Sequence, residues 1–344
     1  MRKFNGTGII CCLAVLFMTL LPLCCVNAQF LPFEAPAEGN KVPADVEMMY
    51  VKGISFLAST QTEAGTWNDN YGNQPGVIGL CIIAMLAHGD DPNTGKYADN
   101  IKRGIDAILK SANPENGYLG ESMYNHGFAT LALAESYGMV HDKRIGPALK
   151  KAVKLILTAQ AHNPRKAWRY SPESNDADTT VSGALLVALF AAANAGIEVP
   201  AKAVEDALKF YASCQSADGG FGYTSPGGSN MPRTAIGALV YSLSDKKSDI
   251  YKNAFLYLRK NLDSGVQPQG YFFYYLYYAS QAFFHSSNQA DWKKWNDLNI
   301  RTLKTMQNAD GSWNGNHGTV FSTAAALLSL ALNYRFLPIY ERQK

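Results

Sequence analysis

Two kinds of helical segment alternate along the chain. The first kind is amphipathic, with lysines and acidic residues on one side, as in the stretch 150–156 (KKAVKLI). The second kind is apolar or small almost all round, as in residues 77–87 and 181–193. A helix with one polar face lies at a surface, whereas a helix without a polar face is surrounded by other elements. The pattern predicts six helix pairs in an all-α protein, at 44–60 and 75–88, 97–111 and 123–137, 144–161 and 179–195, 200–215 and 231–244, 248–262 and 271–285, and 290–308 and 318–334.

A short motif links the two members of each pair. In the first copy an amphipathic helix ends at Gln61, and a turn then carries Gly65 and Trp67. Full or degenerate copies return at intervals of about 51 residues, and about 41 for the last one, which is typical of arrays of one supersecondary unit. The positions that repeat the glutamine and the aromatic residue are Gln61, Trp67, Gln160, Trp168, Gln215, Phe221, Gln307 and Trp313.

This motif resembles the QW repeat of squalene and oxidosqualene cyclases. The first copy satisfies every position of that repeat, with Lys52, Gly53, Phe56, Leu57, Gln61, Gly65 and Trp67. The resemblance implies a single-domain α/α toroid over residues 44–344, C-terminal tail included, with two concentric rings of helices. It also implies a structural role for the repeated residues, between the end of an outer helix and the start of the next inner helix.

The N-terminal residues have the pattern of a secretory signal peptide. Arg2 and Lys3 precede an apolar run over 9–25, and small residues precede Gln29, so that residues 1–28 are expected to be cleaved after Ala28. A retained anchor or a lipoprotein are the alternatives. Residues 29–43 are expected to form an extended, proline-containing lead-in. The mature protein is therefore expected in the periplasm, the cell envelope or the extracellular space, without a transmembrane segment.

Charge and cysteine content exclude several function classes. Removal of Arg2 and Lys3 takes the formal net charge from +3 to +1, so no basic field exists that would recruit nucleic acid. Four of the six cysteines lie in the signal peptide, and Cys81 and Cys214 remain. Both stand in apolar helical segments, which favours two buried thiols over a disulfide, although a single bridge stays open.

Candidate binding residues gather where the apolar helices begin. The loops that enter these helices are mostly ten to seventeen residues long and would all emerge at one end of a toroid, which we call the mouth. An aromatic run, YFFYYLYY, follows at 271–278, and one face of it could provide an apolar ligand site. The candidate ligand-binding residues at the mouth are Gln74, Tyr124, Arg233, Tyr274, Tyr275 and His317.

An acidic turn offers candidate catalytic groups. The sequence Asp176-Ala177-Asp178-Thr179-Thr180 resembles the Asp-x-Asp-Asp-Thr-Ala motif of class II terpene cyclases, with Thr179 in place of the third aspartate. The resemblance implies that Asp178 would protonate an alkene or epoxide, helped by Asp176 and His126. The alternative is that Asp178 caps the helix that begins at Thr179, which is an ordinary role for aspartate.

Several activities find no support in the sequence. Protein prenyltransferases hold zinc with an Asp-x-Cys pair and a distant histidine, and this chain has no Asp-x-Cys, so we expect no metal and no cofactor. The functions that remain are the binding of an isoprenoid-like ligand, a cyclase, a docking toroid for a cell-envelope protein, and a polysaccharide lyase.

Overall fold

A computed structural model describes residues 42–263 and 270–337. The predicted signal peptide and nearly all of the lead-in lie outside the described residues, as do the last seven residues. Contacts divide the chain after Ala37, and all the described residues belong to the second unit, Glu38–Lys344.

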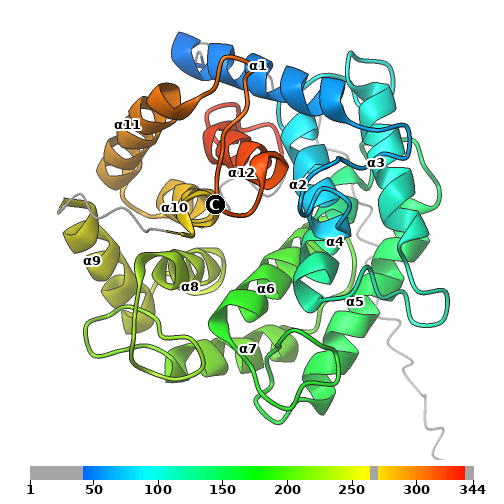
Figure 1. The fold of residues 1–344 in the computed structure, drawn as a ribbon. Helices are drawn as coiled ribbons and strands as arrows, with labels where there is room; N and C mark the ends of the chain where they lie inside the picture. The colour runs from blue at the N-terminus through cyan, green and yellow to red at the C-terminus, as the bar shows by residue number, and fades with distance from the viewer. Residues whose placement is uncertain (1–41, 264–269, 338–344) are drawn as a thin grey trace, which may run out of the picture. The chain divides into compact units, whose positions relative to one another are not determined.

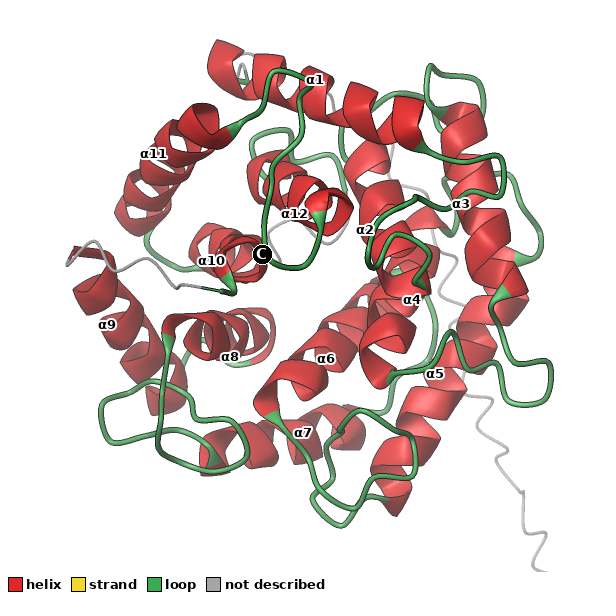
Figure 2. Cartoon of the chain, in the orientation of Figure 1, coloured by secondary structure: helices red, strands yellow, loops and turns green. Residues whose placement is uncertain are grey.

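Twelve helices and no β-strand occur in the described residues, which confirms the predicted all-α fold (Figure 2). The outer helices are α1 (Ala44–Thr60), α3 (Ala98–Lys110), α5 (Ile145–His162), α7 (Ala201–Ser213), α9 (Asp249–Asp263) and α11 (Gln289–Met306). The inner helices are α2 (Pro75–Leu86), α4 (Met123–Ser136), α6 (Thr179–Asn194), α8 (Met231–Ser244), α10 (Phe272–His285) and α12 (Thr319–Ala331).

The inner helices form a closed ring. Each contacts the next inner helix in the chain, and α12 contacts α2, so that the six surround a common axis (Figure 1). The outer helices pack around this ring, as the alternation of amphipathic and apolar segments predicts. Every residue of α2 is buried, whereas α3 buries only the four apolar or small residues of one face. The two concentric rings of an α/α toroid are therefore present.

The repeated glutamines join neighbouring outer helices. The Gln61 carboxamide donates to the Asn100 carbonyl at the start of α3, and the Gln215 carboxamide donates to the Ile250 carbonyl at the start of α9. The glutamines therefore have the structural role that the resemblance implies, in the turn after each outer helix. Each carboxamide reaches across to the first turn of the next outer helix, where free acceptors are available beside the repeat turn.

The aromatic residue of each full repeat ties the turn to its own helix pair. The Trp313 indole donates to the Leu303 carbonyl of α11 at 2.9 Å, while its backbone N–H donates to the Thr323 hydroxyl of α12 at 3.0 Å. The indoles of Trp67 and Trp168 donate in the same way to carbonyls of α1 and α5. These aromatic side chains are buried, so the hydrogen bonds satisfy groups that water does not reach.

The same contacts close the ring between the last repeat and the first. The Gln307 carboxamide donates to the Met49 carbonyl of α1 at 2.9 Å. Gly311 has a φ of 91°, and a Cβ at this position would lie 2.4 Å from the Lys52 carbonyl oxygen. Only glycine combines this backbone conformation with so close an approach.

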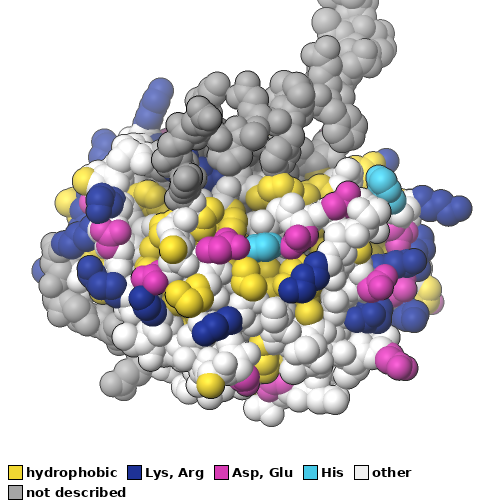
Figure 3. Space-filling model, turned by 90° about the horizontal axis from the view of Figure 1, so that it is seen from above, with side chains coloured by type: hydrophobic (Ala, Val, Ile, Leu, Met, Phe, Trp, Pro, Cys, Tyr) yellow, Lys and Arg dark blue, Asp and Glu magenta, His cyan; other side chains and the backbone are white. Residues whose placement is uncertain are grey.

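The surface carries charges of both signs. Lysine and arginine side chains alternate with aspartate and glutamate on the face seen in Figure 3, with hydrophobic side chains between them. None of the helices in the described chain is both long enough and apolar enough to cross a membrane. Cys81 and Cys214 are both buried free thiols.

Candidate ligand cavity

A cavity of about 1040 Å³ opens where the inner helices begin. Its lining residues lie in the loops that enter these helices or within the first six residues of the helices themselves, a depth of roughly 8 Å at 1.5 Å per residue. Below it, the buried side chains of Tyr277, Tyr278 and Leu131 lie in the middle turns of the ring. The lumen is therefore hollow at its mouth.

The wall of the cavity changes character with depth. Apolar side chains line the part that lies inside the ring, namely Val77, Leu80, Phe128 and Phe321. Tyrosines, amides and a few charged groups line the rim. The rim tyrosines are Tyr71, Tyr170, Tyr223 and Tyr271, and three of them are strongly exposed, at 47%, 46% and 56% for Tyr71, Tyr170 and Tyr271. The cavity thus combines an apolar interior with a polar aromatic entrance.

Five of the six candidate ligand-binding residues line this cavity: Gln74, Tyr124, Arg233, Tyr274 and His317. His317 lies among three aromatic rings, with centroid distances of 5.5 Å to Tyr271, 5.7 Å to Phe321 and 6.4 Å to Tyr71. Gln74 accepts a hydrogen bond from the Asn125 carboxamide at 2.8 Å, so this part of the rim is fixed between α2 and α4.

The placement of Tyr275 at the cavity was wrong. This side chain is buried and packs edge-to-face on Trp295 of the outer helix α11, with centroids 5.4 Å apart. Successive residues of a helix are about 100° apart, so that Tyr274 and Tyr275 cannot both face the lumen.

Tyr274 belongs to a chain of hydroxyl groups that leads from the cavity to a buried carboxylate. Its hydroxyl lies 3.1 Å from that of Tyr124, which also interacts with the Thr180 hydroxyl. Thr180 in turn donates to Asp178 Oδ1 at 2.5 Å. Burial raises the pKa of the Tyr124 and Tyr274 phenols well above the ordinary value, so both stay neutral.

Asp178 caps α6. Its Oδ1 accepts hydrogen bonds from the backbone N–H groups of Thr180 and Val181 at 2.8 and 2.9 Å. The side chain is fully buried and does not line the cavity, and its Oδ2 has no hydrogen-bond partner but lies 3.6 Å from Arg169 Nε. Burial raises the pKa of this carboxyl group, while the bonds to Thr180 and Val181 and the nearby guanidinium oppose that effect.

Asp176 lies outside the cavity as well. Its carboxylate is 65% exposed and pairs with Arg169 Nη1 at 2.5 Å. Arg169 therefore connects the two aspartates of the acidic turn, and its guanidinium also stacks on Tyr170 and Tyr223.

The expectation that His126 lies at the mouth beside the acid was also wrong. The imidazole is completely buried on the side of α4 that faces the outer helix α5. Its Nδ1 accepts a hydrogen bond from the Leu119 N–H at 3.0 Å, and its Nε2 lies 3.0 Å from the Ala152 carbonyl. Both ring nitrogens are thus committed to the backbone, and burial lowers the pKa of this group to about 4.

Sequence reasoning missed several lining residues. Those outside the earlier set include Tyr71, Tyr170, Tyr223 and Tyr271 at the rim and Phe128 and Phe321 inside. The signal available for them was position, because each lies in an entering loop or in the first turns of an inner helix. No group of three or more His, Cys, Asp or Glu side chains that could hold a metal ion occurs in the described part of the chain.

Comparison with known proteins supports the fold. The sequence matches no protein-family model and has no significant match among curated proteins. Among solved structures, the chain is similar to a variant of the type II terpene cyclase MstE from Scytonema, in complex with the substrate geranylgeranyl dihydroxybenzoate. The TM-score is 0.60 at 14% identity, over 85% of this chain and 98% of the cyclase.

Two further similar structures are of one mannanase. The GH76A α-1,6-mannanase from Salegentibacter sp. HEL1_6 superposes with a TM-score of 0.65 at 9% identity, over 83% of this chain and 98% of the enzyme. An inactive variant in complex with α-1,6-mannotetrose gives 0.64 at 11% identity, over 85% and 100%. The chain therefore has an α/α-toroid fold similar to the folds of the Scytonema cyclase and of this mannanase.

Proposed function

We propose that this protein binds an elongated, isoprenoid-like ligand, with its apolar chain inside the ring and its polar end at the mouth. The observation that carries the proposal is the graded cavity, in which Val77, Leu80 and Phe128 line the interior and tyrosines line the entrance. A cavity of about 1040 Å³ lies at the upper end of the range in which proteins bind small molecules. The substrate of the Scytonema cyclase has the same division into an apolar chain and a polar end.

The binding role is favoured over catalysis because of what lines the cavity. Among the described residues that line the cavity, Glu121 is the single carboxylate, and it is exposed at the rim. The signal peptide expected over residues 1–28 supports export, so that the ligand would be met in the cell envelope or outside the cell. Instead of a small molecule, the mouth could bind a protein of the cell envelope.

A class II cyclase-like reaction is the second candidate. The chain of hydroxyl groups from Asp178 through Thr180 to Tyr124 would provide a route for a proton from a buried acid to the cavity. The Scytonema cyclase matches this chain over 98% of its own length, so one toroid of this size is compatible with that chemistry. Arg169 opposes the proposal, because a guanidinium 3.6 Å from Asp178 Oδ2 favours the ionised carboxylate over the acid.

Equilibrium binding tests the proposed function. The probe is geranylgeraniol, a C20 isoprenoid alcohol, and binding is measured by isothermal titration calorimetry. Phe321, half-buried in the cavity wall, is replaced in Phe321→Glu, which puts a charge where the chain would lie. Leu256, 60% exposed on outer helix α9, gives the control Leu256→Glu.

We expect the parent protein and Leu256→Glu to bind with the same affinity. Phe321→Glu is expected to lose binding by about tenfold or more, because an ionised carboxylate is costly beside an apolar chain. Folding of each variant is checked by thermal unfolding. If the alcohol does not bind to the parent protein, or binds equally well to folded Phe321→Glu, the proposed site is wrong.

A further inference from the structure

The guanidinium of Arg233 lies in the cavity wall, and no carboxylate of the described residues pairs with it. Arg233 stands in the first turn of α8, where Asn230 caps the helix by accepting from the Arg233 backbone N–H at 3.0 Å. Its side chain is half-buried and lines the cavity. It forms no ion pair with any carboxylate in the described parts of the chain, and its buried Nε has no hydrogen-bond partner there.

Arg169, at the same entrance, is an arginine whose charge is paired with carboxylates. Arg169 pairs with Asp176 at 2.5 Å and lies 3.6 Å from Asp178. Both guanidinium groups stack on the Tyr223 ring, with Cζ-to-centroid distances of 5.3 Å for Arg169 and 5.8 Å for Arg233. Both aspartates thus lie within ion-pair distance of Arg169, and neither forms an ion pair with Arg233 in the described residues.

The local structure holds the Arg233 guanidinium in place. Its Nη2 donates to the Gly228 carbonyl at 2.6 Å, and Gly227 and Gly228 both have positive φ angles, 111° and 59°. This loop geometry brings a carbonyl to one edge of the guanidinium and leaves the other N–H groups without a described protein acceptor. Such a fork of donors matches the oxygens of a carboxylate or a phosphate.

The helix dipoles around the mouth add to the positive electrostatic potential near Arg233. All the inner helices begin at the mouth, so the positive ends of their dipoles point there. Among the described lining residues, Glu121 is the one negative charge, and its side chain is exposed to solvent. It precedes α4, whereas Arg233 lies on α8, and α6 stands between these two helices in the inner ring. Water screens an exposed carboxylate, so it offsets little of a partly desolvated charge on another helix.

We propose that the ligand of this cavity carries an anionic head group, a carboxylate or a phosphate, and that Arg233 pairs with it. This inference rests on the proposed function and adds to it the chemistry of the polar end. The head group would lie beside Tyr223 and Tyr271 at the entrance, while the apolar chain extends to Val77 and Leu80. The ion pair with the head group would then compensate for the partial desolvation of the Arg233 guanidinium in the cavity wall.

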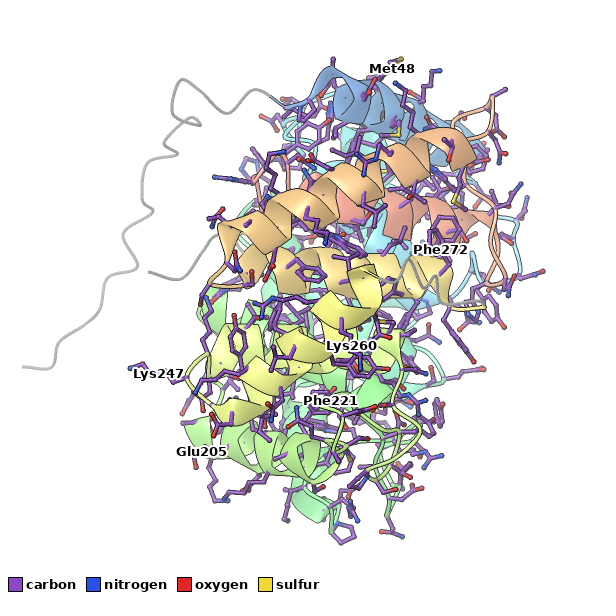
Figure 4. All side chains as sticks on the ribbon, turned by 90° about the vertical axis from the view of Figure 1, so that its left-hand side faces the viewer. Met48, Glu205, Phe221, Lys247, Lys260 and Phe272 are labelled. Atoms are coloured by element: carbon purple, nitrogen blue, oxygen red, sulfur yellow. The ribbon has the colours of Figure 1, made fainter. Side chains whose placement is uncertain are left out.

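The test compares three probes with the same C20 chain, geranylgeraniol, geranylgeranoic acid and geranylgeranyl phosphate, below their aggregation concentrations at pH 8. Affinities are measured for the parent protein, for Arg233→Gln, and for Arg233→Lys, which keeps the charge. Lys247→Gln is the control that removes an exposed positive charge. Lys247 lies at the end of the toroid opposite Phe272, the first residue of α10 (Figure 4).

We expect the parent protein and Lys247→Gln to bind an anionic probe about tenfold or more tightly than the alcohol, as for a charge-assisted hydrogen bond. Arg233→Gln should bring this ratio close to one, and Arg233→Lys should restore part of the ratio. An unchanged ratio in Arg233→Gln would overturn the inference.

Two further outcomes separate this inference from the proposed function. Equal binding of all three probes by the parent protein would reject the anionic head group while the binding site stands. Absence of binding for all three would reject both. Higher salt should reduce the preference for the anionic probes in the parent protein and leave the alcohol unaffected.

Discussion

His126 offers a quantitative test of the way the toroid is held together. The Leu119 N–H can only donate, so the Nδ1 atom that faces it at 3.0 Å must be an acceptor, and the proton of the neutral ring is on Nε2, facing the Ala152 carbonyl. A second proton on the imidazole would set two N–H groups against each other in a fully buried site. The folded protein therefore keeps His126 neutral.

The lowered pKa of His126 determines how much folding stability is lost at acidic pH. Burial lowers the pKa of His126 from an ordinary value of 6.5 to about 4 in the folded state. Because the pKa of His126 is lower in the folded state, the unfolded chain binds the proton first as the pH falls. The contribution of neutral His126 to folding stability is therefore fully present above about pH 6.5 and is lost as the pH falls towards 4. At 1.36 kcal/mol per pKa unit, the loss between pH 7.5 and pH 5 is about 2 kcal/mol.

Urea unfolding at pH 7.5 and pH 5 measures this loss. His126→Gln provides an acceptor and a donor without a titrating group, so the variant should lose about 2 kcal/mol less than the parent protein between the two pH values. His162→Gln is the control, because His162 is exposed. Proton NMR of the parent protein should also show one imidazole that does not titrate above pH 5. An identical pH dependence in His126→Gln and the parent protein would refute the argument.

Three further predictions concern the repeats and the acidic turn. Gly311→Ala should destabilise the toroid by at least about 1 kcal/mol more than Gly138→Ala in urea unfolding, because both glycines have positive φ but only Gly311 approaches a carbonyl oxygen. Trp313→Phe should cost about 1 kcal/mol of unfolding free energy through the lost indole hydrogen bond, and an unchanged unfolding midpoint would speak against that bond. Asp178→Asn should keep the cap, whereas Asp178→Ala should cost about 1 kcal/mol; loss of a cyclisation activity in stable Asp178→Asn would instead favour the cyclase.

The helices could be predicted from the sequence because their ends carry local signals. Ser122, Asp178 and Asn230 each cap an inner helix with a side-chain oxygen, and the predicted starts at 123, 179 and 231 agree with the structure. The partner of the repeated glutamine could not be predicted. A glutamine at a helix end shows that an acceptor is needed, but Gln307 finds it in Met49, 258 residues away, and only ring closure brings the two together.

The candidate site was predicted in part, for a reason that lies in the inner helices. These helices are apolar on all sides, so their sequence does not indicate which face lines the lumen. Tyr124 and His126 are two positions apart, about 200° around a helix, and only Tyr124 faces the cavity. The distance of a residue from the start of its helix therefore predicted how deep in the ring it lies. It did not predict whether the side chain faces the lumen or an outer helix.

Native mass spectrometry of the protein purified from its own source would show whether the cavity holds a ligand. We expect a small molecule bound at one per chain, released by organic solvent, with an apolar chain and an acidic end. Phe321→Glu should lose this molecule, and Leu256→Glu should retain it. A protein that carries no such molecule and takes up none of the C20 probes would contradict the account.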